Sequence, residues 1–397
     1  MVLTFDFDMI IVVYLVSPWQ TFHRRPMLEA LARQAVGRAA ILCVNPVLSL
    51  RQLCSPSLQR YCKAGWLSPQ RLSENLYLFT PVVWLPKGGR RWQNKKSSAW
   101  QMISAQVRDL ARKIAPGAGK IISWIYRPQQ LSCLGLAGEN LIVYECYDKY
   151  CLSHIDGQEV FGIKELEDDL LKKADLVFTT GQGLYGFLME KHPHVYYAPN
   201  GANFEVFSAA QNRGLSIAAD LVKIPSPRIG YTGSLTGRVD FELLEKIAGH
   251  NNSWSLVIVG PVAAEVKIKV QELAQQANVY YLGPRPYELI PQYLKELDVC
   301  IIPYKMHKWN DYSSPLKLWE YLAAGKPVVS TPAKETEGLK ELIWFAQGHG
   351  AFIDAIKDVL KSDVRDRTQC GKKLAQQHSW DKLTYKMFET IRESFDE

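Results

Sequence analysis

The sequence contains eight cysteines but no C-x-x-C pair and no cluster of cysteine or histidine at the spacing of metal ligands. We interpret the cysteines as reduced thiols, which excludes a disulfide framework and a zinc finger. Low-complexity tracts and repeats of fixed period are also missing, and their absence disfavours solenoids and repeat arrays. The cysteines are Cys43, Cys54, Cys62, Cys133, Cys146, Cys151, Cys300 and Cys370.

Long apolar runs are missing from the start of the chain. The unbroken apolar run 9–16 is too short for a signal sequence or a membrane span, and it follows Asp6 and Asp8 instead of basic residues. We therefore expect a cytoplasmic protein, and peripheral contact with a membrane surface stays open.

The 397 residues are 47% hydrophobic, which is enough to bury the cores of two ordinary domains. Short runs rich in β-branched residues alternate with amphipathic stretches of helical length, a pattern typical of βα units around a parallel sheet. Strands are expected at 9–16, 40–44, 120–125, 141–146, 175–180, 195–198, 228–232, 255–260, 279–282, 299–303 and 328–331. Helices of the first half are expected at 25–34, 98–114, 161–173 and 183–191.

The segment 199–227 is rich in Asn, Gly, Ala, Ser and Pro, which suits a linker and the approach to a second domain. We expect a first domain over 1–200 and a second over 201–378. The remainder, 379–397, is expected to form an amphipathic helix with Ser379 as a good N-cap, and this helix could pack back on the first domain.

The strongest local signal is SSPLKLWEYLAAGKPVVST, at residues 313–331. Ser313 or Ser314 is expected to cap a helix, Pro315 to fit its first turn, and Gly325 to end it before a strand. The free amides and the positive dipole end of such a helix would suit a diphosphate.

Lys317 and Glu320 are three residues apart and therefore share a helical face. The lysine could neutralise phosphate, while the glutamate could accept hydrogen bonds from both hydroxyls of a ribose. A solvent-exposed ion pair is the alternative, and the capping signals and the following strand favour the nucleotide site.

PLKLWEYLAAGKPVVST resembles the donor-site helix of GT-B glycosyltransferases, particularly the large retaining family of group 1 glycosyl transferases and its members in teichuronic-acid and polysaccharide biosynthesis. Other segments agree in order: VSPWQTFHRRP, VYECYDKY, DLLKKADLVFTT, PNGANFEVF, RIGYTGSLTGRVDFELL, SLVIVGP, NVYYLGPRPYELIPQYLKELDVCIIPY and HSWDKL. The resemblance covers most of residues 140–397. It implies an α/β protein with two Rossmann-like domains, whose parallel sheets face each other across a cleft, with the acceptor bound by the first domain and the nucleotide-sugar donor by the second.

The resemblance also implies the site residues. Lys317 and Arg238 would stabilise the departing diphosphate without a metal, and Asp148 would act as a base or contact the sugar. No cofactor is expected, because the nucleotide-diphosphate sugar is a co-substrate. The donor contacts would be Gly233, Ser234, Arg238, Tyr304, Ser313, Ser314, Pro315, Leu316, Lys317 and Glu320.

Two short patterns argue for other classes only weakly. Asp6-Phe7-Asp8 has the form of the D-x-D metal motif of the other major glycosyltransferase fold, but its place before the first strand favours coincidence. Gly230, Gly233 and Gly237 lack the spacing of the dinucleotide fingerprint, so a nicotinamide enzyme is disfavoured.

One position departs from the family pattern. Many relatives carry a glutamate eight positions before Glu320, and here that position is Tyr312, which leaves the donor sugar and the stereochemistry open. On the acceptor side, Glu145 and Asp148 lie at the carboxyl end of a strand, where they either contact ligand or only cap the following turn. His23, His154 and His307 fall in loops that could face the cleft, although histidines in loops are more commonly solvated.

The excess of Lys and Arg behind the net charge of +7 lies in the first 200 residues. Residues 51–127 contain 14 Lys or Arg against two acids, with five tryptophans interleaved. Such a surface could rest on anionic lipid, and a soluble basic face over buried tryptophans is the alternative. Nucleic acid is a poor candidate, because no recognition fold is visible. The tryptophans are Trp66, Trp84, Trp92, Trp100 and Trp124.

The sequence thus predicts a glycosyltransferase of hexosyl type that moves a sugar from a nucleotide sugar to a cell-surface polysaccharide precursor or a lipid-linked acceptor. Two rivals remain open: a nucleotide-sugar epimerase of the same fold, and a non-catalytic subunit that binds glycan or nucleotide sugar. Tyr312 keeps the second rival open.

Overall fold

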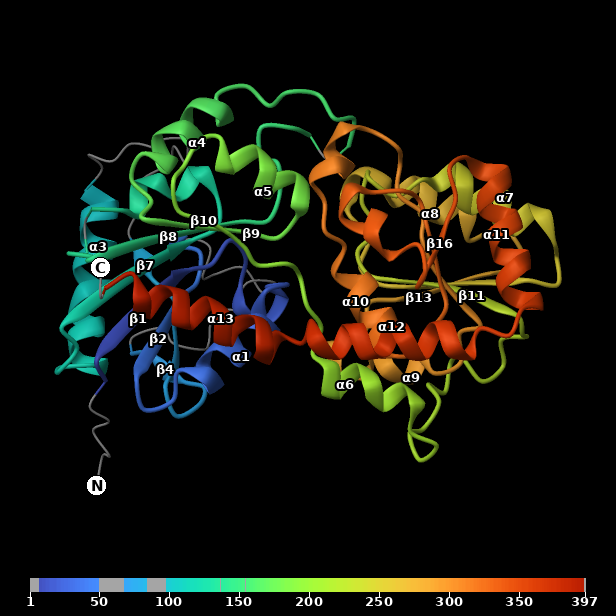
Figure 1. The fold of residues 1–397 in the computed structure, drawn as a ribbon, viewed down its shortest axis with the longest axis horizontal. Coiled ribbons are helices and arrows are strands. Elements are labelled where there is room, and N and C mark those ends of the chain that lie inside the picture. Colours follow the sequence, from blue (N-terminus) through green and yellow to red (C-terminus); the bar gives the residue numbers. More distant parts are fainter. Residues whose placement is uncertain (1–6, 50–67, 84–97, 136, 154, 396–397) are drawn as a thin grey trace.

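The computed structural model describes residues 7–49, 68–83, 98–135, 137–153 and 155–395. Within these residues, eight strands form the sheet of an N-terminal domain and six form that of a C-terminal domain (Figure 1). The strand orders are β10-β9-β8-β7-β1-β2-β5-β4 and β13-β12-β11-β14-β15-β16. Every pairing described in these two sheets is parallel except that of β4 with β5. The predicted α/β class is confirmed.

The N-terminal domain contains the first ten strands. They are β1 Met9–Tyr14, β2 Ala39–Val44, β3 Leu48–Ser49, β4 Gln70–Arg71, β5 Leu76–Phe79, β6 Val82–Val83, β7 Lys120–Ile125, β8 Leu141–Cys146, β9 Leu176–Thr179 and β10 Val195–Tyr197, of which β3 and β6 pair apart from the main sheet. Its helices are η1 Trp19–Thr21, α1 Arg25–Gln34, α3 Ser98–Ile114, η4 Pro128–Cys133, α4 Ile163–Leu171 and α5 Gln182–Met189.

The C-terminal domain repeats the βα alternation. Its strands are β11 Arg228–Thr232, β12 Ser255–Val259, β13 Val279–Gly283, β14 Val299–Ile302, β15 Val328–Ser330 and β16 Trp344–Phe345. Its helices are α6 Phe204–Ser208, η5 Ala209–Gln211, α7 Phe241–His250, η6 Ala264–Val266, α8 Lys267–Leu273, η7 Tyr287–Leu289, α9 Ile290–Leu294, η8 Lys308–Tyr312, α10 Leu316–Ala323, η9 Lys334–Leu339, α11 His349–Lys361 and α12 Arg365–Gln377, and the last helix is α13 Trp380–Glu393.

The N-terminal sheet is buried on both faces because its central strands are continuously apolar. Ile11 and Val13 of β1 pack into one core, together with residues of α1 and α13. Ile10 and Val12, which point to the opposite face, pack into a second core with residues of α3, α4 and α5. This two-sided burial fixes the register of β1 and therefore the position of the loops at its carboxyl end.

The segment predicted as a linker is mostly part of the C-terminal domain. Phe207, Leu221 and Ile224 are buried in the core of that domain. The chain leaves β10 and reaches α6 in a few residues, so the passage between the domains is short.

The chain crosses between the domains twice, and the two crossings are hydrogen-bonded to each other. The Ala202 amide donates to the His378 carbonyl (3.3 Å), and the Trp380 amide donates to the Ala202 carbonyl (3.1 Å). A Cβ atom on Gly201 would lie 2.5 Å from the His378 carbonyl oxygen, so only glycine fits between the crossings. Ser379 is the N-cap residue of α13, but its side chain makes no capping hydrogen bond, contrary to prediction.

The final helix belongs to the N-terminal domain by its contacts. Figure 1 shows α12 along the C-terminal domain and α13 continuing across the N-terminal one. Trp380, Met387 and Phe388 of α13 are buried in the same core as Leu28 and Leu31 of α1. The last segment of the chain therefore joins the two domains through apolar burial.

A second contact between the domains is made at the start of α5. A Cβ atom on Gly183 would lie 2.0 Å from the Asp311 carbonyl oxygen, and one on Gly181 would lie 2.9 Å from the Tyr312 carbonyl oxygen. The two glycines allow α5 of the N-terminal domain to approach the η8 backbone of the C-terminal domain.

None of the helices in the part of the chain that the structure describes combines the length and the apolar character needed to cross a membrane.

Replacing Gly183 by alanine should separate the two domains locally, because the new methyl group overlaps a backbone oxygen that cannot rotate away. We expect Gly183→Ala to lower the free energy of unfolding by about 1–3 kcal/mol and to increase the radius of gyration in X-ray scattering. Gly186→Ala, on the same helix with no heavy atom within 4 Å of its new Cβ, is the matched control and should be neutral or stabilising by about 0.4–1 kcal/mol. Equal behaviour of the two variants would contradict the close approach.

Candidate active site

The amino end of α10 opens on the carboxyl edge of the C-terminal sheet. The helix begins at Leu316 with Pro315 as its N-cap residue, and no side chain caps it, so the prediction that Ser313 or Ser314 would do so is wrong. Its first amides have no acceptor within the helix. Gly325, with φ of +66°, ends the helix as predicted.

The two serines are buried for another reason. Ser314 donates its hydroxyl to Glu335 Oε1 (3.3 Å), and its carbonyl accepts from Asn200 Nδ2 (2.5 Å). The Ser313 amide donates to the Asn310 carbonyl (3.1 Å). Both residues therefore fix the loop before α10.

Lys317 is buried at the centre of the candidate donor site. Its Nζ donates to Tyr231 Oη (2.8 Å) and Tyr304 Oη (2.9 Å). Burial alone would lower the pKa of Lys317, but the two tyrosine oxygens outweigh it and the pKa is raised, so the side chain keeps its charge. A Cβ on Gly233, which has φ of +125°, would lie 3.2 Å from this Nζ, so the glycine keeps the space beside the ammonium open.

Arg238 adds a second positive charge at the same place. Its guanidinium lies 4.8 Å from the Tyr304 ring and 5.6 Å from the Trp309 ring. Ser234, also predicted to contact donor, has an exposed side chain, and its carbonyl accepts from Tyr231 Oη (2.8 Å). Lys317, Arg238 and the start of α10 together make one end of the C-terminal domain strongly positive.

Glu320 lies one turn along α10 from Lys317 and is only partly exposed. Burial raises the pKa of Glu320 to about 7, while Lys317 and a hydrogen bond with Tyr287 act in the opposite direction. The carboxyl group is therefore poised to change its charge near neutral pH.

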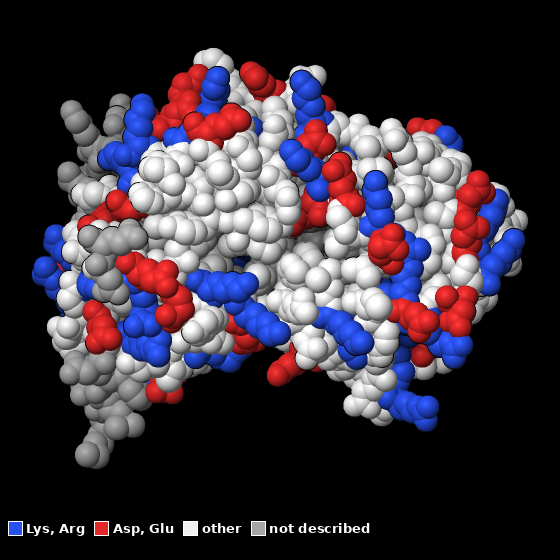
Figure 2. Space-filling view, in the orientation of Figure 1, with Lys and Arg blue, Asp and Glu red and all other residues white. Residues whose placement is uncertain are grey.

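Asp148 of the N-terminal domain faces the positive end of the C-terminal domain. Burial raises the pKa of Asp148 to about 6, and the charges of Arg238, Arg127 and Arg24 lower it in part. Because Arg238 belongs to the opposite domain, this interaction joins the two domains. Figure 2 shows that one face of the molecule is indented where the domains meet. The structure thus brings together the residues predicted to be catalytic.

His23 is a member of this site that the sequence did not single out from other loop histidines. Its ring packs edge-on against the Tyr147 ring, with 4.8 Å between centroids. Desolvation, followed by the charges of Arg24, Arg127 and Arg238, lowers the pKa of His23 to about 3. The imidazole is therefore neutral and can donate or accept a hydrogen bond without adding charge. His154 lies outside the described residues, and His307 packs beside Gly157 (3.5 Å from the Cβ position).

Glu145 does not face ligand. Its carboxylate is fully buried, forms an ion pair with the buried Arg24, and accepts a hydrogen bond from Trp124 Nε1 (3.0 Å). Arg24 also donates to Asn200 Oδ1 and lies 5.0 Å from the Trp380 ring. This network joins β8, α1 and both crossings between the domains.

Glu335, which the sequence did not indicate, connects the domains a second time. Its Oε2 accepts from the Gln182 amide at the start of α5 (2.8 Å), and its Oε1 accepts from Tyr197 Oη (2.7 Å) and from Ser314. Burial raises the pKa of Glu335 to about 7, against the effect of these three donors. The partners are distant in sequence, and no local pattern could have revealed them.

Tyr312, at the position where relatives carry a glutamate, packs on the N-terminal domain. Its ring meets the Phe187 ring edge-on at 6.3 Å, and its Cδ1 would lie 3.3 Å from a Cβ on Gly183. The side chain therefore contributes to the contact between the domains.

The part of the chain that the structure describes holds no group of three or more His, Cys, Asp or Glu side chains arranged to bind a metal ion. Asp6 of the D-x-D pattern lies outside that part, as do Trp66, Trp84 and Trp92 of the basic segment.

The arrangement of the two domains is that of the GT-B fold. Sucrose-phosphate synthase from Thermosynechococcus elongatus matches with a TM-score of 0.71 at 15% identity, over 98% of this chain and 99% of that one. HepE of Anabaena in complex with UDP and glucose matches with a TM-score of 0.66 at 13% identity, over 96% of this chain and 99% of HepE. An E. coli trehalose-6-phosphate protein bound with UDP-2-fluoro glucose matches with a TM-score of 0.66 at 11% identity, over 96% of this chain and 98% of that one. The predicted fold is confirmed.

Sequence comparison finds relatives of part of the chain. Residues 226–362 match the family described as glycosyl transferases group 1. TuaH of Bacillus subtilis (strain 168), whose name assigns it provisionally as a glycosyltransferase of teichuronic acid biosynthesis, is 28% identical over 233 residues. That match spans 55% of this chain and 58% of TuaH, little more than half of each. Residues 226–362 are thus similar to the group 1 glycosyl transferases, the family that the motifs resemble.

Replacing Arg24 by methionine should destabilise the junction of the domains, because it leaves the buried Glu145 without its ionic partner. We expect a loss of about 3–5 kcal/mol in the free energy of unfolding, measured by chemical denaturation. Arg33→Met removes the exposed ion pair with Asp381 (2.9 Å) between α1 and α13 and should cost less than about 1 kcal/mol. The double variant Arg24→Met, Glu145→Leu should be more stable than Arg24→Met alone, because it leaves no unpaired buried carboxylate. If Arg24→Met, Arg33→Met and the double variant all had the free energy of unfolding of the wild type, the network would not stabilise the protein.

Proposed function

We propose that the protein transfers a hexose-type sugar from a nucleotide-diphosphate sugar to an acceptor in the assembly of a cell-surface polysaccharide. The observation that carries the proposal is the placement of Lys317 and Arg238, at the amino end of α10, opposite Asp148 of the other domain. The names of similar proteins support it, since they include teichuronic acid biosynthesis and complexes with UDP, glucose and UDP-2-fluoro glucose.

In this proposal the donor lies on the C-terminal domain, over residues 201–378. Its diphosphate contacts Lys317, Arg238 and the amides from Ser314 to Leu316, and its ribose hydroxyls donate to Glu320. The open space beside Gly233 leaves room for phosphate oxygens near the ammonium. The remaining proposed contacts lie around the phosphates and come from Ser313, Ser234 and Tyr304.

The departing diphosphate gains negative charge as the bond from the anomeric carbon to its oxygen breaks. Lys317 and Arg238 are positive groups that are already in place, so they need no reorganisation during the reaction. We propose that these side chains take the part of a metal ion. The acceptor hydroxyl forms the new bond to the anomeric carbon and loses its proton.

The acceptor is proposed to lie on the N-terminal domain, residues 1–200, on the cytoplasmic side of the cell envelope. Asp148 is the candidate to receive the hydroxyl proton or to bind the donor sugar. With a pKa of about 6, it is mostly ionised at neutral pH and can accept a proton there.

The test is to incubate the protein with UDP-hexoses and an acceptor fraction from cell envelopes, and to follow release of UDP. Lys317→Ala should slow release by about 100- to 1,000-fold while donor affinity falls less, because the charge matters most as the leaving group departs. Lys361→Ala, an exposed lysine in the last turn of α11, is the control and should match the wild type.

Other outcomes separate the rival functions. A protein that binds UDP-hexose but releases no UDP with any acceptor would be a binding subunit. One that changes the donor sugar without an acceptor would be an epimerase. Equal losses of affinity and rate in Lys317→Ala would reduce the lysine to a binding group.

Glu320 should make donor binding depend on pH. Because the pKa of Glu320 is about 7 in the free protein, the carboxylate that accepts both ribose hydroxyls is present above this value and lost below it. We expect UDP-glucose to bind more tightly as pH rises from 6 to 8, in calorimetric titrations. Glu320→Gln should abolish this pH dependence, and Glu320→Ala should weaken binding by about 10- to 100-fold with the fold intact. A wild-type affinity that does not change with pH would argue against Glu320 as the ribose ligand.

A further inference from the structure

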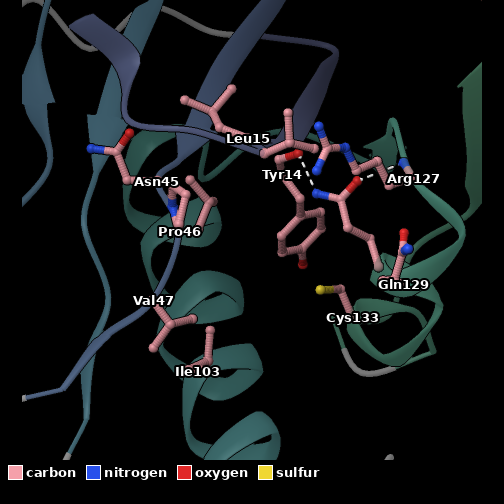
Figure 3. Close-up of a pocket in the computed structure, with 12 residues that line it drawn as sticks. Tyr14, Leu15, Asn45, Pro46, Val47, Ile103, Arg127, Gln129 and Cys133 are labelled. Carbon is pink, nitrogen blue, oxygen red and sulfur yellow. Dashed lines mark hydrogen bonds between the residues drawn. The ribbon is translucent and has the colours of Figure 1, made fainter. Parts of the chain in front are cut away.

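A pocket of about 420 Å³ opens in the N-terminal domain at the carboxyl ends of β1 and β2. Figure 3 shows it between Asn45, Pro46 and Val47 on one side and Tyr14 and Cys133 on the other. Ile103 of α3 adds an apolar wall. Its volume lies within the usual range for small-molecule sites, roughly 300–1,000 Å³.

Two of the three amide side chains that line the pocket, those of Asn45 and Gln130, are hydrogen-bonded within the protein, and the third, Gln129, is exposed. Asn45 accepts from the Trp19 amide (2.9 Å) and donates to Thr80 Oγ1 (2.9 Å). Gln130 accepts from the amides of Tyr126 (2.8 Å) and Arg127 (2.9 Å) and donates to the Tyr14 carbonyl (2.7 Å).

Because Asn45 and Gln130 bond to the protein, they offer little to a polar ligand, and this indicates which kind of molecule the pocket can hold. A sugar ring carries a hydroxyl on almost every carbon, and burying hydroxyls without partners is costly. The Tyr14 hydroxyl, beside Ser123, is a single buried polar group, too little to match a saccharide. An aliphatic chain needs no partners and gains free energy from contact with the apolar walls.

The open end of the pocket is charged. Among its lining residues, Arg127 and Gln129 are the exposed ones. The guanidinium of Arg127 interacts with Asp148, so this end of the pocket adjoins the candidate reaction site. An apolar slot that ends at a cation fits a molecule with a chain at one end and an anion next to it.

We propose that this pocket holds the aliphatic chain of the acceptor, and that Arg127 binds the phosphate that joins this chain to the acceptor saccharide. The saccharide then extends from the phosphate toward Asp148. This inference rests on the proposed function and makes it more specific, since the acceptor becomes a saccharide linked by phosphate to a lipid chain.

The test uses monomeric n-hexyl and n-octyl phosphate, with inorganic phosphate as the chain-free reference, in calorimetric titrations without detergent. Two further buried methylenes should tighten binding by about tenfold from hexyl to octyl phosphate. Val47→Trp, which fills the pocket, should remove this dependence on chain length, and Val16→Trp, at another lining position, should do the same. Arg127→Gln should weaken both alkyl phosphates by the same factor and keep the dependence.

Val222→Trp, at an exposed valine of the C-terminal domain, is the matched control and should bind both alkyl phosphates as the wild type does. Circular dichroism spectra and thermal unfolding curves like those of the wild type show that the two pocket-filling variants are folded. The inference is overturned if chain length has no effect on the wild type, or if both filled variants retain that effect. It is also overturned if Val47→Trp loses binding to phosphatidylglycerol vesicles but not to monomeric octyl phosphate. Failure of the wild type to bind UDP or to release it from UDP-hexoses would count against the proposed function instead.

Discussion

A buried positive charge determines how the two domains of this protein meet. Arg24 is almost inaccessible to water, and a cation in such a place is stable only when its charge and its donors are matched. Glu145 supplies the charge, and Asn200 supplies a further acceptor while its amide group reaches the Ser314 carbonyl. The same small network therefore contains the end of β8, the first crossing and the loop before α10, so α10 is positioned relative to the N-terminal sheet.

The two sides of the candidate site are complementary in charge. Lys317 and Arg238 give the C-terminal side two cations, while Asp148 is the acid that faces them. Desolvation, together with the charges of three guanidinium groups, keeps His23 neutral. An anionic donor would thus be attracted to one side of the gap, while the other side offers an acid, a neutral imidazole and, beyond Arg127, an apolar pocket.

Much of the fold and part of the site could be predicted, because their signals are local. The apolar runs of β1 and β7 and the glycine that ends α10 depend on neighbouring residues only, and Lys317 lies near Tyr304 because α10 follows β14 closely. The short strands β3 to β6 have too few residues to show a period. The partners of Ser314, Glu145 and Glu335 are far away in sequence, so nothing near them could show that they are bonded within the protein. The pattern PNG at 199–201 is explained only by the structure, because Gly201 allows the two crossings to pack closely and Asn200 bonds to the loop before α10.

The paired crossings at Ala202 and Trp380 also decide how the protein can move. A single flexible connection would let one domain rotate about any axis relative to the other, whereas two connections that are hydrogen-bonded side by side define one hinge axis. Rotation about one axis remains easy, and twisting or sliding does not. Widening the gap by such a rotation would break the contacts that Glu335 and Tyr312 make with α5 and its neighbours, and closing would return the same residues to the same opposing positions.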